Sequence, residues 1–219
     1  MKCLNKKYRW YSRIITILYC IYMLLYADRY DFMALNVLLA YIPIEISFHF
    51  KQVGNRLFFL LGMLWLLFYP NAPYLFTDFF HLEQLSIYPG MHQIFGLSIS
   101  DWVSFSLLTV GICIYGFLGL ATIFTMLDEC FRRKILQKKW QSIFFILLVN
   151  LLSSLAIFVG RFDRLHSIHL VTKPVQTLQI IFLKWSTDKV QFILLLTGVQ
   201  LLLLACIVGL DKMKLGDKV

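Results

Sequence analysis

Residues 101–127 read DWVSFSLLTVGICIYGFLGLATIFTML, and no residue after Asp101 in this stretch carries a charge. A helix needs about 20 predominantly apolar residues to cross the hydrocarbon core of a bilayer. The stretch is long enough for that, and its composition suits lipid as the solvent. It is therefore predicted to be a transmembrane helix.

Comparable apolar runs recur from one end of the chain to the other. The chain is 59% hydrophobic and 15% charged, with a mean hydropathy of +0.73, whereas soluble domains contain roughly 45–50% apolar and about 25% charged residues. We therefore predict one all-α integral membrane domain over residues 1–219, a polytopic transmembrane helical bundle of about six spans. The five further spans are predicted at 11–27, 32–49, 57–69, 140–159 and 190–210.

Lysines and arginines gather at one end of the predicted spans. With six spans and the N-terminus inside, the inner segments hold 15 of the 21 cations. This bias follows the positive-inside rule and predicts a plasma or inner membrane protein with both termini in the cytoplasm. The basic run 132–139 is interpreted as a contact to anionic membrane lipids. A nucleic-acid partner is not expected, because no water-exposed basic domain is visible.

Two of the predicted outer segments are too long to be simple turns. Residues 73–86 favour a short helix, since Asn71 can cap it and Pro73 suits a first turn. Residues 175–186 place apolar side chains at helical spacing, with polar side chains apart from them. Both segments are predicted to be interfacial helices on the outer side.

A set of polar residues in these outer segments forms a candidate ligand site. Arginine pairs bidentately with carboxylates and phosphates, so an outer arginine pair suggests a pocket for an anionic ligand. The alternative is a structural latch, in which the arginines pair with Asp78, Glu83, Asp101 or Asp163. The candidate ligand-binding residues are Asn71, Asp78, His81, Asp101, Arg161 and Arg164.

The same region contains a weaker candidate for a divalent metal site. Asp78 and His81 are three residues apart, as are His166 and His169, and aspartate and histidine are common metal ligands. The competing interpretation is a network of hydrogen-bonded interfacial residues. No other cofactor is indicated.

Glu45 is a carboxylate inside the second predicted span. Ionisable groups in spans are costly and often functional. One interpretation is a local pair with His49, one helical turn on. The other is proton or ion coupling in a transporter.

Several blocks of the chain form a recognisable set: YPNAPY at 69–74, TDFFHL at 77–82, Asp101 with Trp102, the glycine-bearing stretch through Gly116, and GRF at 160–162 with Arg164 and Ser167. Together these blocks resemble the DUF1361 family of predicted bacterial membrane proteins. The resemblance covers roughly residues 57–174. It departs at His166 and His169, where the family is expected to carry an amide and an acid. It implies a multi-spanning bacterial membrane protein and no particular activity.

Three functions are consistent with these features. The first is binding or modifying an envelope or lipid-linked ligand at the outer polar cluster. The second is a small transporter or permease, and the third is a membrane scaffold or accessory subunit without a site. The residues do not decide whether the protein is an enzyme, and membrane lipids are the only partners they indicate.

Overall fold

The computed structural model describes residues 6–85, 98–163, 172, 175, 179 and 185–216. Within this part of the chain every regular element is a helix, which confirms the predicted all-α class. The elements are α1 (Lys6–Tyr26), η1 (Asp28–Tyr30), α2 (Phe32–Ser47), η2 (Phe50–Gln52), α3 (Asn55–Phe68), α4 (Asn71–Thr77), η3 (Asp78–Gln84), α5 (Ile99–Arg132), α6 (Lys139–Arg161) and α9 (Thr187–Gly216).

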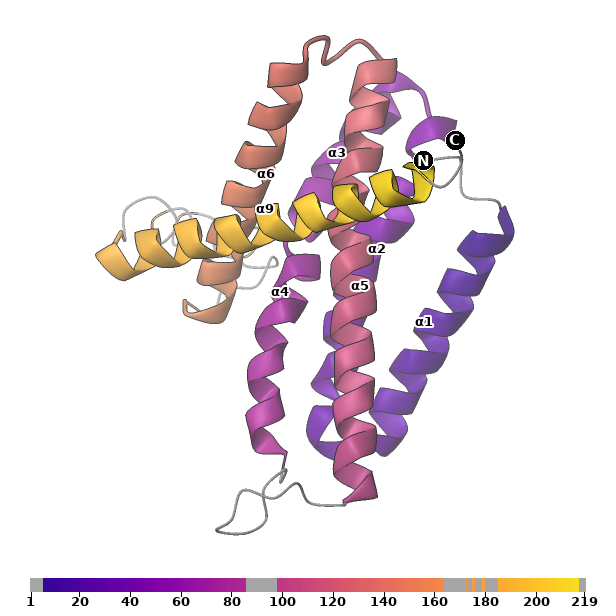
Figure 1. Cartoon of the computed structure of the whole chain (residues 1–219), viewed down its shortest axis with the longest axis vertical. Coiled ribbons are helices and arrows are strands. Elements are labelled where there is room, and N and C mark those ends of the chain that lie inside the picture. Colours follow the sequence, from indigo (N-terminus) through magenta and orange to yellow (C-terminus); the bar gives the residue numbers. More distant parts are fainter. Residues whose placement is uncertain are drawn as a thin grey trace.

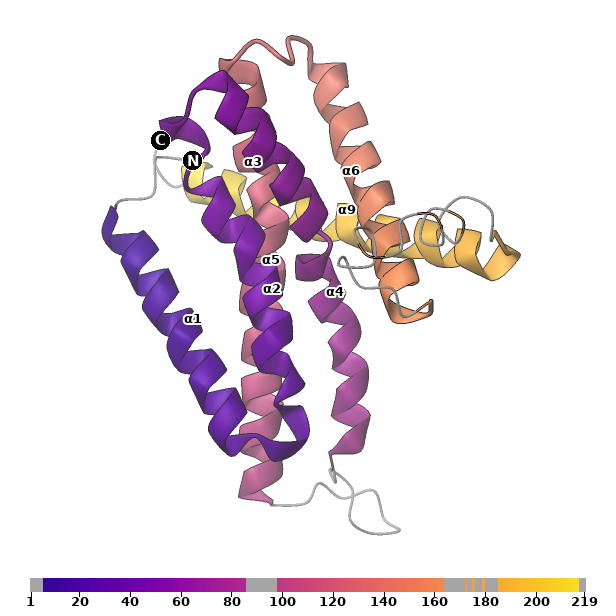
Figure 2. The same ribbon diagram turned by 180° about the vertical axis from the view of Figure 1, so that it is seen from behind.

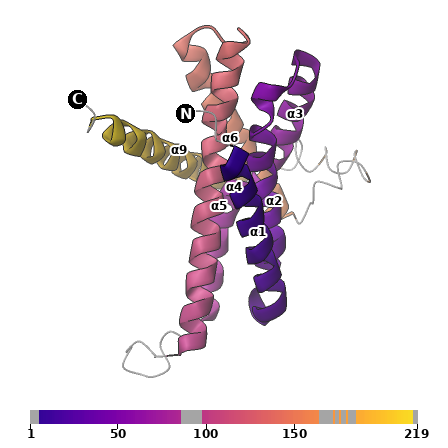
Figure 3. The same ribbon diagram turned by 90° about the vertical axis from the view of Figure 1, so that its right-hand side faces the viewer.

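Helix α2 is the centre of the bundle, because it packs against α1, α3, α4 and α5. Figures 1 and 2 show α1, α2 and α5 as long neighbouring helices, with α4 continuing the direction of α3. Helix α6 contacts α4 and α9. Helix α9 crosses the other helices steeply, and Figure 3 shows that its C-terminal half leads away from the bundle.

Five helical segments are long and apolar enough to cross a membrane. Helix α1, which contains the predicted span 11–27, is not among them, so that span stays a prediction. Each of the other five predicted spans lies within one of these segments. The span predicted at 57–69 is part of a longer apolar run that continues through α4 and η3. The segments are Phe32–Gln52, Asn55–Glu83, Ile99–Arg132, Lys139–Arg161 and Thr187–Met213.

The block YPNAPY at 69–74 lies where the helical run is interrupted. Helix α3 ends at Phe68, and α4 begins at Asn71 with Pro73 in its first turn, where the missing N–H is tolerated. The predicted capping role of Asn71 is wrong. Its Nδ2 instead donates to the carbonyl oxygen of Phe68, 2.9 Å away, and bridges the break. Whether 73–86 is interfacial stays a prediction, since it forms one apolar run with α3.

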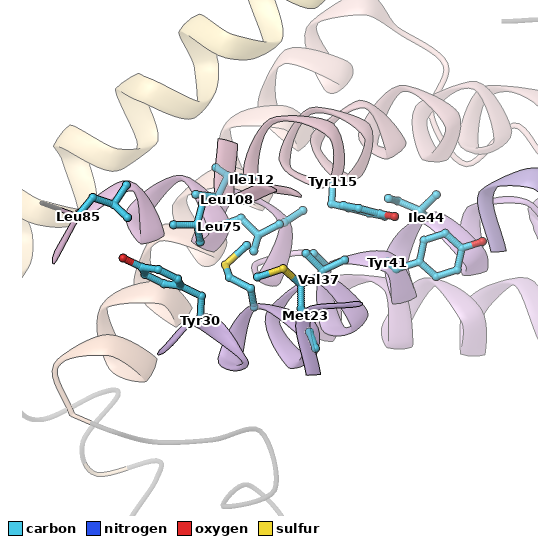
Figure 4. Close-up of a cluster of buried hydrophobic side chains, with 14 residues drawn as sticks. Met23, Tyr30, Val37, Tyr41, Ile44, Leu75, Leu85, Leu108, Ile112 and Tyr115 are labelled. Carbon is cyan, nitrogen blue, oxygen red and sulfur yellow. The ribbon is translucent and has the colours of Figure 1, made fainter. Parts of the chain in front are cut away.

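The contact between α4 and α5 is tight and sets their relative position. A Cβ atom on Gly119 would overlap the side chain of Ala72, and one on Gly116 would overlap the ring of Phe76. The two helices therefore run antiparallel, with Ala72 opposite Gly119 and Phe76 opposite Gly116. Figure 4 shows the apolar core beside this contact, where Leu75 lies among Leu108 and other buried side chains of α1, α2 and α5.

The bundle has two distinguishable ends. At one end Arg133 joins the α2–α3 turn to the end of α5, with Nη1 donating to Asn55 Oδ1 at 2.6 Å and Nη2 donating to the carbonyl oxygen of Val53 at 2.7 Å. We call this the basic end, and it comprises residues 48–56 and 128–141. The opposite end contains the α1–α2 turn and the start of α5 (Figure 1).

Candidate functional site

Asp78, at the junction of α4 and η3, holds three helices together. Its side chain is 1% exposed. Oδ1 accepts a hydrogen bond from Arg161 Nη1 of α6 at 2.9 Å, and Oδ2 accepts one from Asn36 Nδ2 of α2 at 2.8 Å. Both carboxylate oxygens are thus satisfied, as a buried charge requires. We call Asn36, Tyr74, Asp78, His81 and Arg161 the Asp78 cluster.

Arg161 is the last residue of α6 and is held in a fixed orientation. Nη1 also donates to the hydroxyl oxygen of Tyr74 at 2.9 Å, and Nη2 donates to the carbonyl oxygen of Thr77 at 3.2 Å. A guanidinium has five N–H donors, and these contacts, with the one to Asp78, use three. The Nε–H and one Nη2–H have no acceptor among the residues that the structure describes. The side chain is 23% exposed.

His81 lies at the edge of the cluster. Its Nε2 is 3.9 Å from Asp78 Oδ1, and its ring centroid is 4.6 Å from that of Phe32. In the described part of the chain no group of three metal-ligating side chains gathers. Arg161 and Asn36 already occupy the Asp78 oxygens, and the other predicted metal ligands, His166 and His169, lie outside the described residues. The described geometry therefore gives the metal hypothesis no support.

The register of α4 against α5 places Asp78 deep in the bundle. Two residues beyond Phe76 on α4 correspond to about two residues before Gly116 on α5, close to Ile114. Residue 114 is near the middle of 102–127, the part of α5 without a charge. The cluster therefore lies at mid-depth of the long helices rather than at their ends.

Asp101 does not belong to this cluster, contrary to the sequence prediction. It lies 13 residues before Ile114, which is about 20 Å along a helix at 1.5 Å per residue. Its backbone N–H donates to Ser98 Oγ at 3.4 Å, in the first turn of α5. A carboxylate there is favoured by the helix dipole, which gives Asp101 a local structural role.

The structure places the remaining candidates as follows. Asn71 contacts the carbonyl of Phe68 and makes no recorded bond to the cluster. Arg164 lies outside the described residues, as does most of the predicted helix 175–186. Of the predicted ligand-binding residues, the structure therefore brings together Asp78, His81 and Arg161.

The sequence analysis missed Asn36 as a partner of Asp78. Asn36 is the single amide in the otherwise apolar first half of α2. A polar side chain inside a span commonly bonds to a neighbouring helix. The apolar sequence around Asn36 therefore already indicated that this amide needs a hydrogen-bond partner on another helix. Which partner it has depends on how α2 packs against α4.

Glu45 belongs to a second polar network, nearer the basic end. Both of its carboxylate oxygens pair with the guanidinium of Arg13 on α1. The hydroxyl of Tyr41 donates to Oε2 at 3.0 Å, and Oε1 lies 3.1 Å from His49 Nε2, which is the predicted local pair. Between this network and Asn36, the core-facing α2 residues Val37 and Ala40 are buried and apolar.

Long apolar helices enclosing a buried aspartate–arginine pair define an all-α integral membrane protein. Comparison with family models matches residues 35–203 to DUF1361, a family of proteins of unknown function. The chain belongs to the DUF1361 family, and the match includes every member of the Asp78 cluster. Neither the curated proteins nor the solved structures provide a match.

Proposed function

We propose that this protein binds the anionic headgroup of a lipid or lipid-linked ligand at Arg161. The observation that carries the proposal is the difference between the two members of the buried pair. Asp78 is 1% exposed and saturated with partners, whereas Arg161 is 23% exposed and has two N–H donors without an acceptor among the described residues.

The surroundings of Arg161 suit recognition of an oxyanion. Tyr74, Thr77 and Asp78 fix the guanidinium before any ligand arrives. A donor that is already oriented loses less conformational freedom on binding and so binds more tightly. Phosphate and carboxylate groups match the planar guanidinium, which can donate two parallel hydrogen bonds to them.

The depth of the cluster favours a ligand with a lipid tail. Asp78 is level with the middle of the uncharged part of α5, so a ligand that stays in bulk water would not reach Arg161. Arg161 ends α6 at the end opposite its basic start, so the orientation bias of the lysines and arginines supports an approach to this site from the side that faces away from the cytoplasm. An envelope lipid or a lipid-linked intermediate fits both conditions.

The transporter alternative receives less support from the described residues. It requires a polar line from Glu45 to the Asp78 cluster. On α2 the buried apolar side chains of Val37 and Ala40 lie between the two. Polar contacts do extend the Glu45 side, through the bond of Tyr41 with Ser12 and that of Tyr115 with Thr16, but among the described residues no recorded hydrogen bond joins them to the cluster. A scaffold without a site is the other alternative. In that case Arg161 would serve only to fasten α6 to α2 and α4.

The proposal can be tested by native mass spectrometry of the purified protein with a polyprenyl phosphate and with the uncharged polyprenol of the same chain length. We expect the wild type to prefer the phosphate. R161Q should lose about tenfold or more of this preference, because each hydrogen bond to a charged group contributes about 1.5–3 kcal/mol. R161K keeps the positive charge but loses the two parallel donors of the guanidinium, so its preference for the phosphate should lie between those of the wild type and R161Q.

The matched control is R13Q, which removes the arginine that pairs with Glu45 and should leave the preference unchanged. Equal binding of phosphate and alcohol by the folded wild type would refute the proposal. So would an R161Q protein that keeps the full preference, and the Asp78 cluster would then be a latch.

A further inference from the structure

The basic end joins two turns that are far apart in the sequence. Arg133 of the 128–141 segment donates to the carbonyl oxygens of Phe50 and Val53 and to the side chain of Asn55. Its guanidinium also lies 4.4 Å from the ring centroid of Phe58. These contacts hold the α2–α3 turn against the α5–α6 turn, and Figure 2 shows both turns at the same end of the bundle. The charges of the two turns therefore belong to one surface.

This surface carries a large positive charge. Residues 48–56 and 128–141 contain seven lysines and arginines and two carboxylates, a net charge of +5. One carboxylate, Glu129, is buried and bonded to Arg132 and Arg133. Five of the cations are exposed and form no ion pair within the described part of the chain: Lys51, Arg56, Lys134, Lys138 and Lys139.

The turn that carries three of these lysines has a defined backbone. Lys134 adopts a left-handed conformation with φ 59°, its N–H donates to Phe131 O, and the next N–H donates to Cys130 O. This is a Schellman ending of α5. Gln141 Oε1 then accepts from the backbone N–H groups of residues 137 and 138 at 2.7 and 2.9 Å. The lysines therefore occupy defined positions.

Apolar and aromatic side chains accompany the charges. Trp140 is 61% exposed, and Ile135 and Phe131 on the same segment are also exposed. Tryptophan is enriched where a protein meets the headgroup region of a bilayer, and clustered lysines next to a span attract anionic lipids. Water-exposed lysines without these neighbours would not favour a lipid over another anion.

We infer that the basic end is a docking surface for the headgroups of anionic glycerophospholipids. Lysines from the α5–α6 turn and cations from the α2–α3 turn bind the phosphates together, and Trp140 lies among the headgroups. Arg133 is a positioning residue, because its side chain is 8% exposed and its hydrogen bonds hold the two turns side by side. This surface is separate from the Arg161 site and does not depend on it.

The inference can be tested with the full-length protein in phosphatidylcholine vesicles that contain trace spin-labelled phosphatidylglycerol or spin-labelled phosphatidylcholine. Electron paramagnetic resonance measures the fraction of each label that the protein immobilises. We expect the wild type to immobilise a larger fraction of the spin-labelled phosphatidylglycerol than of the spin-labelled phosphatidylcholine. K134Q/K138Q/K139Q should lose about tenfold or more of that preference, since each lysine near the surface contributes about fivefold.

The control is R29Q, which removes an exposed cation at the opposite end of the bundle, and it should leave the preference unchanged. High salt should weaken the wild-type preference, because it screens exposed charges. The inference is overturned if the triple variant keeps the preference or if the wild type immobilises both labels equally. A change in R161Q alone would concern the other site.

Discussion

Besides the Glu129 pairs of the basic end, the described residues contain two arginine–carboxylate pairs, and their settings differ. Asp78 and Arg161 are 1% and 23% exposed, and Asp78 is level with the middle of α5. Glu45 and Arg13 are 27% and 31% exposed and lie nearer the basic end. The same two functional groups are therefore more fully enclosed by the rest of the protein in one pair than in the other. Depth, rather than the chemistry of the pair, should decide what each contributes.

The largest expected effect comes from removing the arginine of each pair. R161Q leaves the Asp78 carboxylate buried with the hydrogen bond from Asn36 and with His81 3.9 Å away, and breaking a buried pair costs about 3–5 kcal/mol. R13Q should cost about 1 kcal/mol, since Glu45 keeps Tyr41, His49 and some exposure. Thermal unfolding of both variants in the same detergent measures the difference. Equal losses would show that depth does not separate the pairs.

The next effect tests whether the loss in R161Q comes from the orphaned charge. The double variant D78N/R161Q removes both charges and keeps the shape of Asp78, so it should recover about 3 kcal/mol relative to R161Q. The same cycle at E45Q/R13Q should recover little. A double variant at Asp78 that is no more stable than R161Q would assign the loss to packing of the arginine stem.

Asn36 provides a third comparison between the pairs. N36L removes one hydrogen bond to the Asp78 carboxylate, and such a bond contributes about 2 kcal/mol. The apolar replacement suits the surrounding α2 residues. The fall in the free energy of unfolding should therefore come from the missing hydrogen bond and not from a weaker α2 helix. Unfolding of N36L and of the matched variant L38N, at an exposed α2 position, separates the two causes. An N36L protein as stable as the wild type would show that Arg161 alone satisfies Asp78.

Much of this arrangement follows from the sequence, and the rest follows from packing. The apolar runs predict the helices, Pro73 predicts the first turn of a helix there, and the structural-latch interpretation predicts an acidic partner for Arg161. That Arg161 pairs with Asp78 rather than with Asp101 was not predictable, because Asp101 lies about 20 Å along α5 from the level of the Asp78 cluster. That offset is set by the Gly116 and Gly119 contacts, which no local pattern encodes.

The pairing of Asn36 and the steep crossing of α9 have the same origin. Asn36 meets Asp78 across 42 positions of sequence, and residue types alone do not specify which faces of α2 and α4 meet. Helix α9 is apolar on most of its surface, so its pattern carries little information about direction. Periodicity predicts that such a helix exists, whereas its crossing depends on the side chains of α6 that it meets.

The smallest expected effect tests the exposed pair directly. Tyr41 donates a 3.0 Å hydrogen bond to Glu45 Oε2, and Y41F removes that hydroxyl without changing the ring. Because Glu45 keeps its contacts to Arg13 and His49 and is 27% exposed, the free energy of unfolding should fall by less than about 1 kcal/mol. Thermal unfolding of Y41F and N36L under the same conditions compares the two losses. If Y41F cost as much as N36L, the Glu45 network would have to be as dry as the Asp78 cluster, and the contrast between the two pairs would disappear. A Glu45 carboxylate that is shielded from water would also strengthen the transporter alternative, since ionisable groups inside spans often handle protons and ions.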